Sequence, residues 1–167
     1  GFLLAKEFQT GVEDDLDCTV QEFYDKFLAD GARETVAAIL AEKELTEISV
    51  GAWEPSEKFG KTRTTVATVH LKGMPIGPSS AKAITVDLVE FEDQTLVWYS
   101  TNQTPDVPYG DTFRLEYRTE ISPLDKRCHF KQQYAVYFFK SCLMKRTIET
   151  TAVSSATKDM QTMLQKY

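Results

Sequence analysis

The chain has 167 residues, 42% of them apolar and 26% charged, with a formal net charge of −6. This composition is that of a globular domain; it excludes a disordered chain and disfavours nucleic acid as a partner. A domain of this length buries roughly two-thirds of the surface that its unfolded chain exposes, which leaves room for a core that contains a cavity.

Targeting segments and cysteines place further bounds on the chain. No apolar run approaches the roughly 20 residues that cross a bilayer, and residues 1–5 are too short for a signal peptide. Cys18, Cys128 and Cys142 form no Cys-x-x-Cys pair, which argues against a disulfide framework and a zinc site and favours a reducing, cytosolic setting. Because the chain begins at Gly1 without an initiator Met, we expect one domain, residues 1–167, cut from a longer protein.

The first part of the chain predicts a strand followed by two short helices. Residues 2–8 are expected to form an edge strand. Thr19 and Glu22 have the spacing of a capping box, and apolar residues at helical spacing follow them. A second helix is expected over residues 32–42. We interpret the acidic residues 13–17 as the charged entry to the first helix rather than as a calcium site.

After residue 43 the apolar periodicity changes from about 3.6 to 2. Gly, Pro and Asp residues separate the segments, which is the pattern of an antiparallel meander with one apolar face. Six strands are expected, at residues 44–53, 62–71, 82–91, 94–102, 112–121 and 127–139.

Residues 143–165 contain no Pro or Gly and are expected to form one long helix. Its middle carries the small residues Thr151, Ala152 and Ser155, so the helix either lies flat on closely packed strands or roofs a cavity. The element order corresponds to an α+β helix-grip architecture, in which a curved seven-stranded antiparallel sheet surrounds the C-terminal helix.

Catalytic constellations are missing from the sequence. His70 and His129 each lie on a predicted strand without a His or Cys partner at metal-ligand spacing, and no nucleophile elbow occurs. We therefore expect no enzyme activity, no catalytic residue, no metal and no cofactor. Binding without chemistry is what the sequence indicates.

One stretch identifies a family. Residues 104–113 (TPDVPYGDTF) and the Arg- and Tyr-rich segment 114–121 resemble VASt domains, the StAR-related lipid-transfer modules of Aster and Lam proteins and of plant cell-death regulators. Weaker similarities follow the family's order along the chain: Phe23, Tyr24 and Phe27; Trp53 and Arg63; the loop 75–78; and residues 140–149.

The resemblance implies a StART-like sterol carrier. It implies a sterol-sized cavity between the sheet and the C-terminal helix, with transfer of the lipid between membranes. The expected partners are a sterol or similar lipid and, transiently, a membrane surface; we expect a monomer. The expected location is the cytosolic face, in a parent protein anchored at the endoplasmic reticulum or a membrane contact site.

The resemblance also implies a mobile loop over the mouth of the cavity. Its two glycines permit hinge motion, and two apolar side chains would form the tip; the alternative is an ordinary hairpin connection. The residues of this expected lid and membrane contact are Gly73, Met74, Pro75, Ile76, Gly77 and Pro78.

Candidate pocket residues follow from the strand alternation, which depends on register because a slip of one residue exchanges the two faces. The expected walls are Ile84, Val86, Leu88, Phe113, Leu115, Tyr117, Phe130 and Tyr134. Thr151, Ala152 and Ser155 would form the roof. Gln132, Tyr117 and Tyr134 are the candidates for the hydrogen bond to a sterol hydroxyl.

Three alternatives remain at this point. The domain carries another hydrophobic ligand, such as a phospholipid or an isoprenoid, or it is a filled module that binds proteins. In the third, it is an enzyme that uses a tyrosine or a carboxylate such as Asp87 or Glu116.

Overall fold

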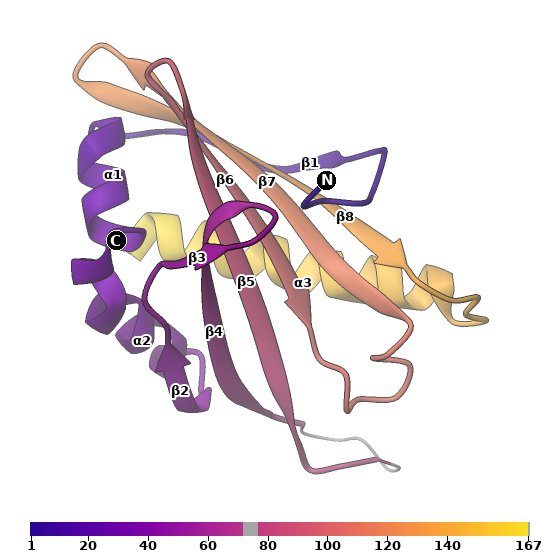
Figure 1. The fold of residues 1–167 in the computed structure, drawn as a ribbon. Coiled ribbons are helices and arrows are strands. Elements are labelled where there is room, and N and C mark those ends of the chain that lie inside the picture. Colours follow the sequence, from indigo (N-terminus) through magenta and orange to yellow (C-terminus); the bar gives the residue numbers. More distant parts are fainter. Residues whose placement is uncertain (72–76, 167) are drawn as a thin grey trace.

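The computed structural model describes residues 1–71 and 77–166. Over these residues, eight antiparallel strands form one sheet, two short helices follow the first strand and a long helix ends the chain (Figure 1). The predicted helix-grip architecture is confirmed, with eight strands rather than seven. None of the described helices is long and apolar enough to cross a membrane.

The element bounds are as follows. The helices are α1 (Val20–Phe27), α2 (Arg33–Glu42), which a 3-10 turn (Asp30–Ala32) precedes, and α3 (Lys145–Lys166). The strands are β1 (Gln9–Leu16), β2 (Thr46–Val50), β3 (Glu54–Ser56), β4 (Gly60–His70), β5 (Ser80–Glu92), β6 (Thr95–Gln103), β7 (Phe113–Leu124) and β8 (Arg127–Phe138). Their order in the sheet is β1-β8-β7-β6-β5-β4-β2, with β3 also paired to β4.

The eighth strand arises because one predicted strand, over 44–53, is interrupted. Gly51 donates its N–H to the Thr64 carbonyl at 2.9 Å, and a Cβ at Gly51 would lie only 2.7 Å from that same oxygen. The chain therefore crosses β4 too closely for any side chain at this point. It resumes pairing with β4 as β3, three residues later.

The first strand is β1, not residues 2–8 as predicted. The acidic residues 13–17 lie largely on it, so their interpretation as a helix entry was wrong. β1 tolerates these acidic residues because it is an edge strand, and basic side chains of the neighbouring strand β8 pair with their carboxylates. Asp15 lies 2.6 Å from His129 Nδ1, and Asp17 lies 2.8 Å from Arg127 Nε.

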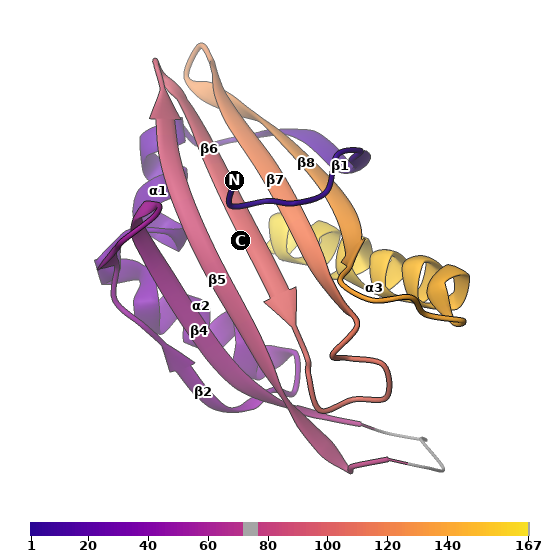
Figure 2. The same cartoon turned by 45° about the vertical axis from the view of Figure 1, so that its right-hand side comes forward.

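The two faces of the sheet are distinguished by β7, whose successive residues point in opposite directions. Ile121 belongs to the core beneath the helices, and Tyr117, four residues earlier, interacts with Asp159 of α3. We name the face of the sheet to which Ile121 and Tyr117 point the inner face. Glu116 points to the outer face, which the N-terminal segment crosses in front of the sheet while the helices lie behind it (Figure 2).

The N-terminal segment is fixed by the buried carboxylate of Glu116. The backbone N–H groups of Leu4 and Ala5 donate to this carboxylate at 2.6–2.9 Å, and Arg114 Nη2 lies 3.1 Å from it. Arg114 also donates to the Phe2 carbonyl. The segment is thus held as a strap on the outer face without belonging to the sheet.

The main apolar core lies at the end of the sheet that α1 covers, and we name it the packed end. Its position follows from α1, whose predicted capping box is present: the Glu22 N–H donates to Thr19 Oγ1 and the Thr19 N–H donates to the Glu22 carboxylate. Phe23 and Phe27 are thereby directed at the sheet. The packed end consists of Val12, Phe23, Phe27, Leu28, Ile39, Leu96, Ile121, Cys128 and Phe130.

Candidate functional site

Helix α3 crosses the inner face near the β1–β8 edge and has no buried residue (Figure 1). Its apolar contacts with the packed end come from its last two turns, where Met160, Met163 and Leu164 pack against the core. Its first half has no such packing. The helix therefore has one attached end and one end that borders open volume.

A groove of about 1340 Å³ lies along β8 at this open side. β1 covers the edge of β8 only as far as Tyr134, so the last part of β8 has no strand neighbour there. The groove is bounded by residues 4–9, by the end of β8 and by the first half of α3. Its lining residues are Leu4, Ala5, Lys6, Glu7, Phe8, Gln9, Tyr134, Ala135, Val136, Tyr137, Phe138, Lys145, Glu149, Thr150, Val153 and Ser154.

The position of α3 depends on one close approach at the sheet edge. A Cβ at Gly11 would lie 2.9 Å from the Tyr134 ring and 3.1 Å from Thr157 Oγ1. Glycine at this position lets the middle of α3 lie close to β1, so the small residues of the helix serve close packing at that point. The middle of α3 therefore lies against β1, as one of the two expectations had it, and the first half of the helix borders the groove.

The inner face beyond the packed end carries half-buried apolar and aromatic side chains. Phe113 and Phe138 are register partners with ring centroids 5.9 Å apart, and Leu115 pairs with Val136 in the same way. These side chains are neither enclosed by a core nor fully exposed. We name the set Phe113, Leu115, Tyr117, Tyr134, Val136 and Phe138 the open end.

Three polar side chains on this face were predicted to bind a hydroxyl. Gln132 is buried and donates to Thr119 Oγ1 at 3.1 Å, while the Tyr134 hydroxyl donates to Gln9 at 3.2 Å. The hydroxyl of Tyr117 makes no hydrogen bond to another described residue, and burial together with the charge of Asp159 raises the pKa of Tyr117. Tyr117 is therefore a neutral hydroxyl with its hydrogen-bonding capacity still unused.

The register divides the predicted wall residues between the two faces. On β5, Asp87 points to the inner face, where it pairs with Arg63 of β4. Because successive residues of a strand point to opposite faces, Ile84, Val86 and Leu88 point to the outer face. They do not share a wall with Tyr117. Phe130 is on the inner face but belongs to the packed end.

The roof residues are offset by one position. Ala152 is half-buried, whereas Thr151 and Ser155 are exposed. The groove is lined instead by Thr150, Val153 and Ser154. The stripe of α3 that faces the sheet contains Ala152 and Ala156, which the sequence alone did not distinguish from their equally small neighbours.

The expected lid falls mostly outside the described residues. Gly73, Met74, Pro75 and Ile76 lie in the part of the chain about which the structure says nothing. Gly77 and Pro78 are described and exposed, and Gly77 has a positive φ of 125°, which favours glycine.

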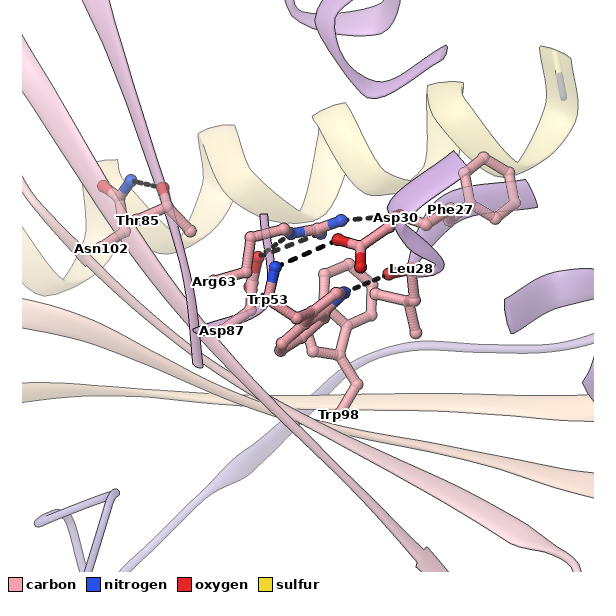
Figure 3. A network of polar contacts seen from close by, with 9 residues as sticks. All are labelled: Phe27, Leu28, Asp30, Trp53, Arg63, Thr85, Asp87, Trp98 and Asn102. Carbon is pink, nitrogen blue, oxygen red and sulfur yellow. Dashed lines mark hydrogen bonds and ion pairs between the residues drawn. The ribbon is translucent and has the colours of Figure 1, made fainter. Parts of the chain in front are cut away.

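A buried polar network on the inner face links the sheet to the helix pair (Figure 3). Arg63 Nη2 lies 3.1 Å from Asp87 Oδ2 and Nη1 donates to the Phe27 carbonyl, while Trp98 Nε1 donates to Asp87 Oδ1 at 2.9 Å. The Trp53 indole donates to Leu28, and its ring stacks on the guanidinium of Arg63. The network fixes the end of α1 on the sheet.

This network also bears on the enzyme alternative. Both carboxylate oxygens of Asp87 are engaged by Arg63 and Trp98, and the Glu116 carboxylate lies on the outer face, engaged by the N-terminal strap. Neither carboxylate is therefore available in the groove. Among the described residues, no group of three His, Cys, Asp or Glu side chains is arranged to hold a metal ion.

Sequence reasoning missed part of the groove. Val136 and Phe138 belong to the apolar alternation of β8, and that signal was present. Residues 4–9 gave no signal, because their place depends on the distant carboxylate of Glu116. Val153 was not predicted as a lining residue, because it lies among the small residues of α3 and no periodic signal sets it apart from them.

The comparisons identify the class of protein that this fold and groove define. Residues 11–155 match the VASt family, the VAD1 analog of StAR-related lipid transfer domain. The match spans most of the chain, so the protein belongs to the VASt family and has its lipid-binding fold, as the resemblance predicted. No curated protein matches the chain.

Among solved structures, the chain resembles norcoclaurine synthase from Thalictrum flavum. One structure of that enzyme has 9% sequence identity and a TM-score of 0.54, and the alignment covers 96% of this chain and 87% of that one. A second, in complex with dopamine and hydroxybenzaldehyde, has 12% identity and a TM-score of 0.51, with 99% and 95% covered. At such identities the likeness concerns the fold alone.

Proposed function

We propose that this domain is a non-catalytic carrier that binds a sterol between the inner face of the sheet and α3 and transfers it between membranes. The observation that carries the proposal is the groove of about 1340 Å³ beside the first half of α3, which exceeds a second groove of about 970 Å³ between α1, β1 and the last turns of α3. Membership of the VASt family supports a lipid as the ligand.

The volume and lining fit an amphiphile of sterol size. Ligand cavities commonly measure about 300 to 1,000 Å³, so an open groove of this size accommodates such a molecule once the first half of α3 closes on it. Each CH2 group that leaves the bilayer must be sheltered from water, at about 0.8 kcal/mol per group. Val136 and Phe138, which line the groove, offer that shelter together with their half-buried register partners on β7.

The polar end of the ligand requires a hydrogen bond inside the domain. Of the three predicted candidates, Gln132 and Tyr134 already have partners, whereas the Tyr117 hydroxyl has none among the described residues. We therefore assign the sterol hydroxyl to Tyr117, which lies on β7 beside Tyr134, a residue that lines the groove. The apolar body of the ligand would then extend from Tyr117 toward Phe113.

The absence of catalysis is part of the proposal. The carboxylates of Asp87 and Glu116, which the enzyme alternative named, are engaged in structural contacts and do not line the groove, whose own carboxylates are Glu7 and Glu149. A phospholipid is the alternative cargo that one observation favours, because Lys145 at the mouth of the groove can bind a phosphate. We also propose that the domain acts as a monomer on the cytosolic face, within a longer protein anchored at the endoplasmic reticulum or a contact site.

The test is transfer of a fluorescent sterol between donor and acceptor liposomes by the purified domain, with a fluorescent phospholipid in parallel. Acceleration at substoichiometric protein, selective for the sterol, is expected. Selective transfer of the phospholipid would show that the cargo is a phospholipid and not a sterol. Transfer of neither lipid, by a folded sample that also fails to retain lipid, would reject a carrier function.

The lid over residues 73–78 stays a prediction from sequence, and the same assay tests it. Replacement of Met74 and Ile76 by Asp is expected to reduce transfer while the melting temperature stays nearly unchanged. A large fall in melting temperature would instead show that the two side chains belong to a core.

A further inference from the structure

The corner between β8 and α3, residues 139–146, exposes large apolar side chains. Leu143 is fully exposed, Phe139 is 45% exposed and Met144 is 40% exposed. Single exposed apolar residues are ordinary, but three within six residues form a patch of the kind that marks an interaction site. Among the three, Leu143 most strongly indicates an interaction site, because its whole side chain is exposed to solvent.

The same corner is cationic in an acidic chain. From residue 139 to residue 148 the sequence contains Lys140, Lys145 and Arg146 and no acidic residue, whereas the whole chain has a net charge of −6. Lys140 is paired with Asp111 at 3.1 Å, and Lys145 lies over the ring of Phe138. The charge of the corner therefore fits an anionic partner.

The placement of these cations opposes the local preference of the helix. Lys145 and Arg146 are the first two residues of α3, and no acidic residue occurs in its first turn. Because the N-terminus of a helix carries partial positive charge, cations there are unfavourable for the isolated helix. Departures from local rules concentrate at functional sites, and here two of them coincide with an exposed leucine.

The corner adjoins the groove at the end of β8. Phe138 and Lys145 both line the groove, and the Phe139 N–H donates to the Thr112 carbonyl of the β6–β7 connection at 2.7 Å. That connection carries Tyr109, an aromatic residue that is 50% exposed. The register places the end of β4 at His70 and the start of β5 at Ser80 at this same end of the sheet.

We propose that this corner is a membrane-docking surface for anionic bilayers. Leu143 and Met144 enter the boundary between headgroups and acyl chains, and Lys145 and Arg146 contact the anionic headgroups. Burial of apolar side chains and attraction of cations to anionic lipids are the two forces that hold proteins on such surfaces. The inference deepens the carrier proposed above, and rests on it for its purpose, because docking here places the groove opening against the membrane.

The experiment measures co-sedimentation of the purified chain with vesicles of phosphatidylcholine alone and with vesicles that also contain phosphatidylserine. Wild type is expected to bind the anionic vesicles more strongly, and added salt should weaken that binding. Leu143→Asp combined with Arg146→Glu is expected to lower the affinity at least about tenfold, because it removes one apolar anchor and reverses one charge. Arg146→Gln alone should lower it about fivefold.

A matched control lies at the opposite end of the sheet. Leu124 is 44% exposed and Lys126 is exposed in the β7–β8 turn, so Leu124→Asp with Lys126→Glu makes the same change in chemistry far from the corner. We expect the control to bind vesicles like wild type and all variants to retain the wild-type melting temperature. Equal losses in both double variants, or no preference of wild type for anionic vesicles, would overturn the proposal.

A measurement without vesicles separates this inference from the carrier function. Fluorescent sterol delivered from cyclodextrin reports loading of the groove alone. Docking without loading of sterol or phospholipid would reject the carrier function but not the membrane-docking surface. Loading without docking would overturn the proposal that the corner binds membranes. If light scattering shows that the corner variant abolishes a dimer while vesicle binding is unchanged, the surface binds a second copy and the proposal is wrong.

Discussion

The packed end and the open end of the sheet both include aromatic side chains and residues of β7 and β8, yet they differ in what covers them. At the packed end, the Phe23 ring of α1 packs against both Phe27 and Phe130, and all three side chains are buried. At the open end, comparable rings on β7 and β8 remain half-buried beneath the first half of α3. An apolar face thus becomes a core or a site according to the length and attachment of the helix above it.

The strongest way to break the packed end is to remove one partner of its buried ion pair. Asp87→Asn leaves the Arg63 guanidinium buried without its counter-charge, and we expect a loss of about 3 to 5 kcal/mol in the free energy of unfolding, measured by urea titration. Glu120→Gln is the control, since it makes the same chemical change in a partly exposed pair with Arg118 and should cost less than about 1 kcal/mol. Equal effects would show that burial of the Arg63–Asp87 pair does not matter.

The contrast between the two ends can be measured with one substitution made twice. Phe130→Ala at the packed end should cost about 4 kcal/mol of unfolding free energy, because Phe130 has no exposed surface and leaves a cavity. Phe113→Ala at the open end should cost about 1 to 2 kcal/mol, because its side chain is only half-buried. Denaturant titration of both variants tests this difference, and similar losses would mean that the open end is an ordinary core.

The polar group of the site is tested by removing single hydroxyls. Tyr117→Phe should lower the affinity for a fluorescent sterol about five- to tenfold, the value of one hydrogen bond, with a change in unfolding free energy below about 1 kcal/mol. Tyr134→Phe is the matched control, because the Tyr134 hydroxyl is already engaged with Gln9. The reverse pattern would assign the hydroxyl of the ligand to Tyr134.

The smallest expected effect concerns the edge strand β1, which borders both ends. Hydrogen bonding to Asp15, followed by the charges of Asp15 and Glu13, raises the pKa of His129. A raised pKa in the folded state means that protonated His129 stabilises β1. This contribution is complete below the ordinary pKa of about 6.5 and is lost as the pH rises through the folded value.

The measurement for His129 compares wild type with His129→Gln at about pH 5.5 and about pH 8.5. The destabilisation by the substitution should be larger at the lower pH and stay below about 1 kcal/mol, because the pair is partly exposed. A larger effect at the higher pH would show that protonated His129 does not stabilise the strand.

The parts of the fold that were predictable depend on local patterns. The capping box at Thr19 and Glu22 fixed the start of α1, and the alternation on β7 and β8 gave the inner face of those strands. The face of β5 was not predictable, because Ile84, Val86 and Leu88 alternate just as regularly, and only the pairing of Asp87 with Arg63 decides which side is inner.

Long-range contacts account for the remaining errors. The N-terminal segment was predicted as a strand since its own residues are apolar, but the Glu116 carboxylate engages its backbone N–H groups more than a hundred residues away in sequence. The close approach of the middle of α3 to β1 likewise depends on Gly11 of that strand. Neither contact leaves a periodic signal in the sequence.

The uneven attachment of α3 has a mechanical consequence. Met160, Met163 and Leu164 fasten its last turns, and Lys166 pairs with Glu42 of α2 at 2.8 Å, while its first turns have no comparable hold. Because the contacts of α3 with the core and with β1 come from its last turns and its middle, displacement of the first turns alone would leave the packed end undisturbed. The work of opening is thereby separated from the free energy that keeps the domain folded, and repeated opening need not bring the chain closer to unfolding.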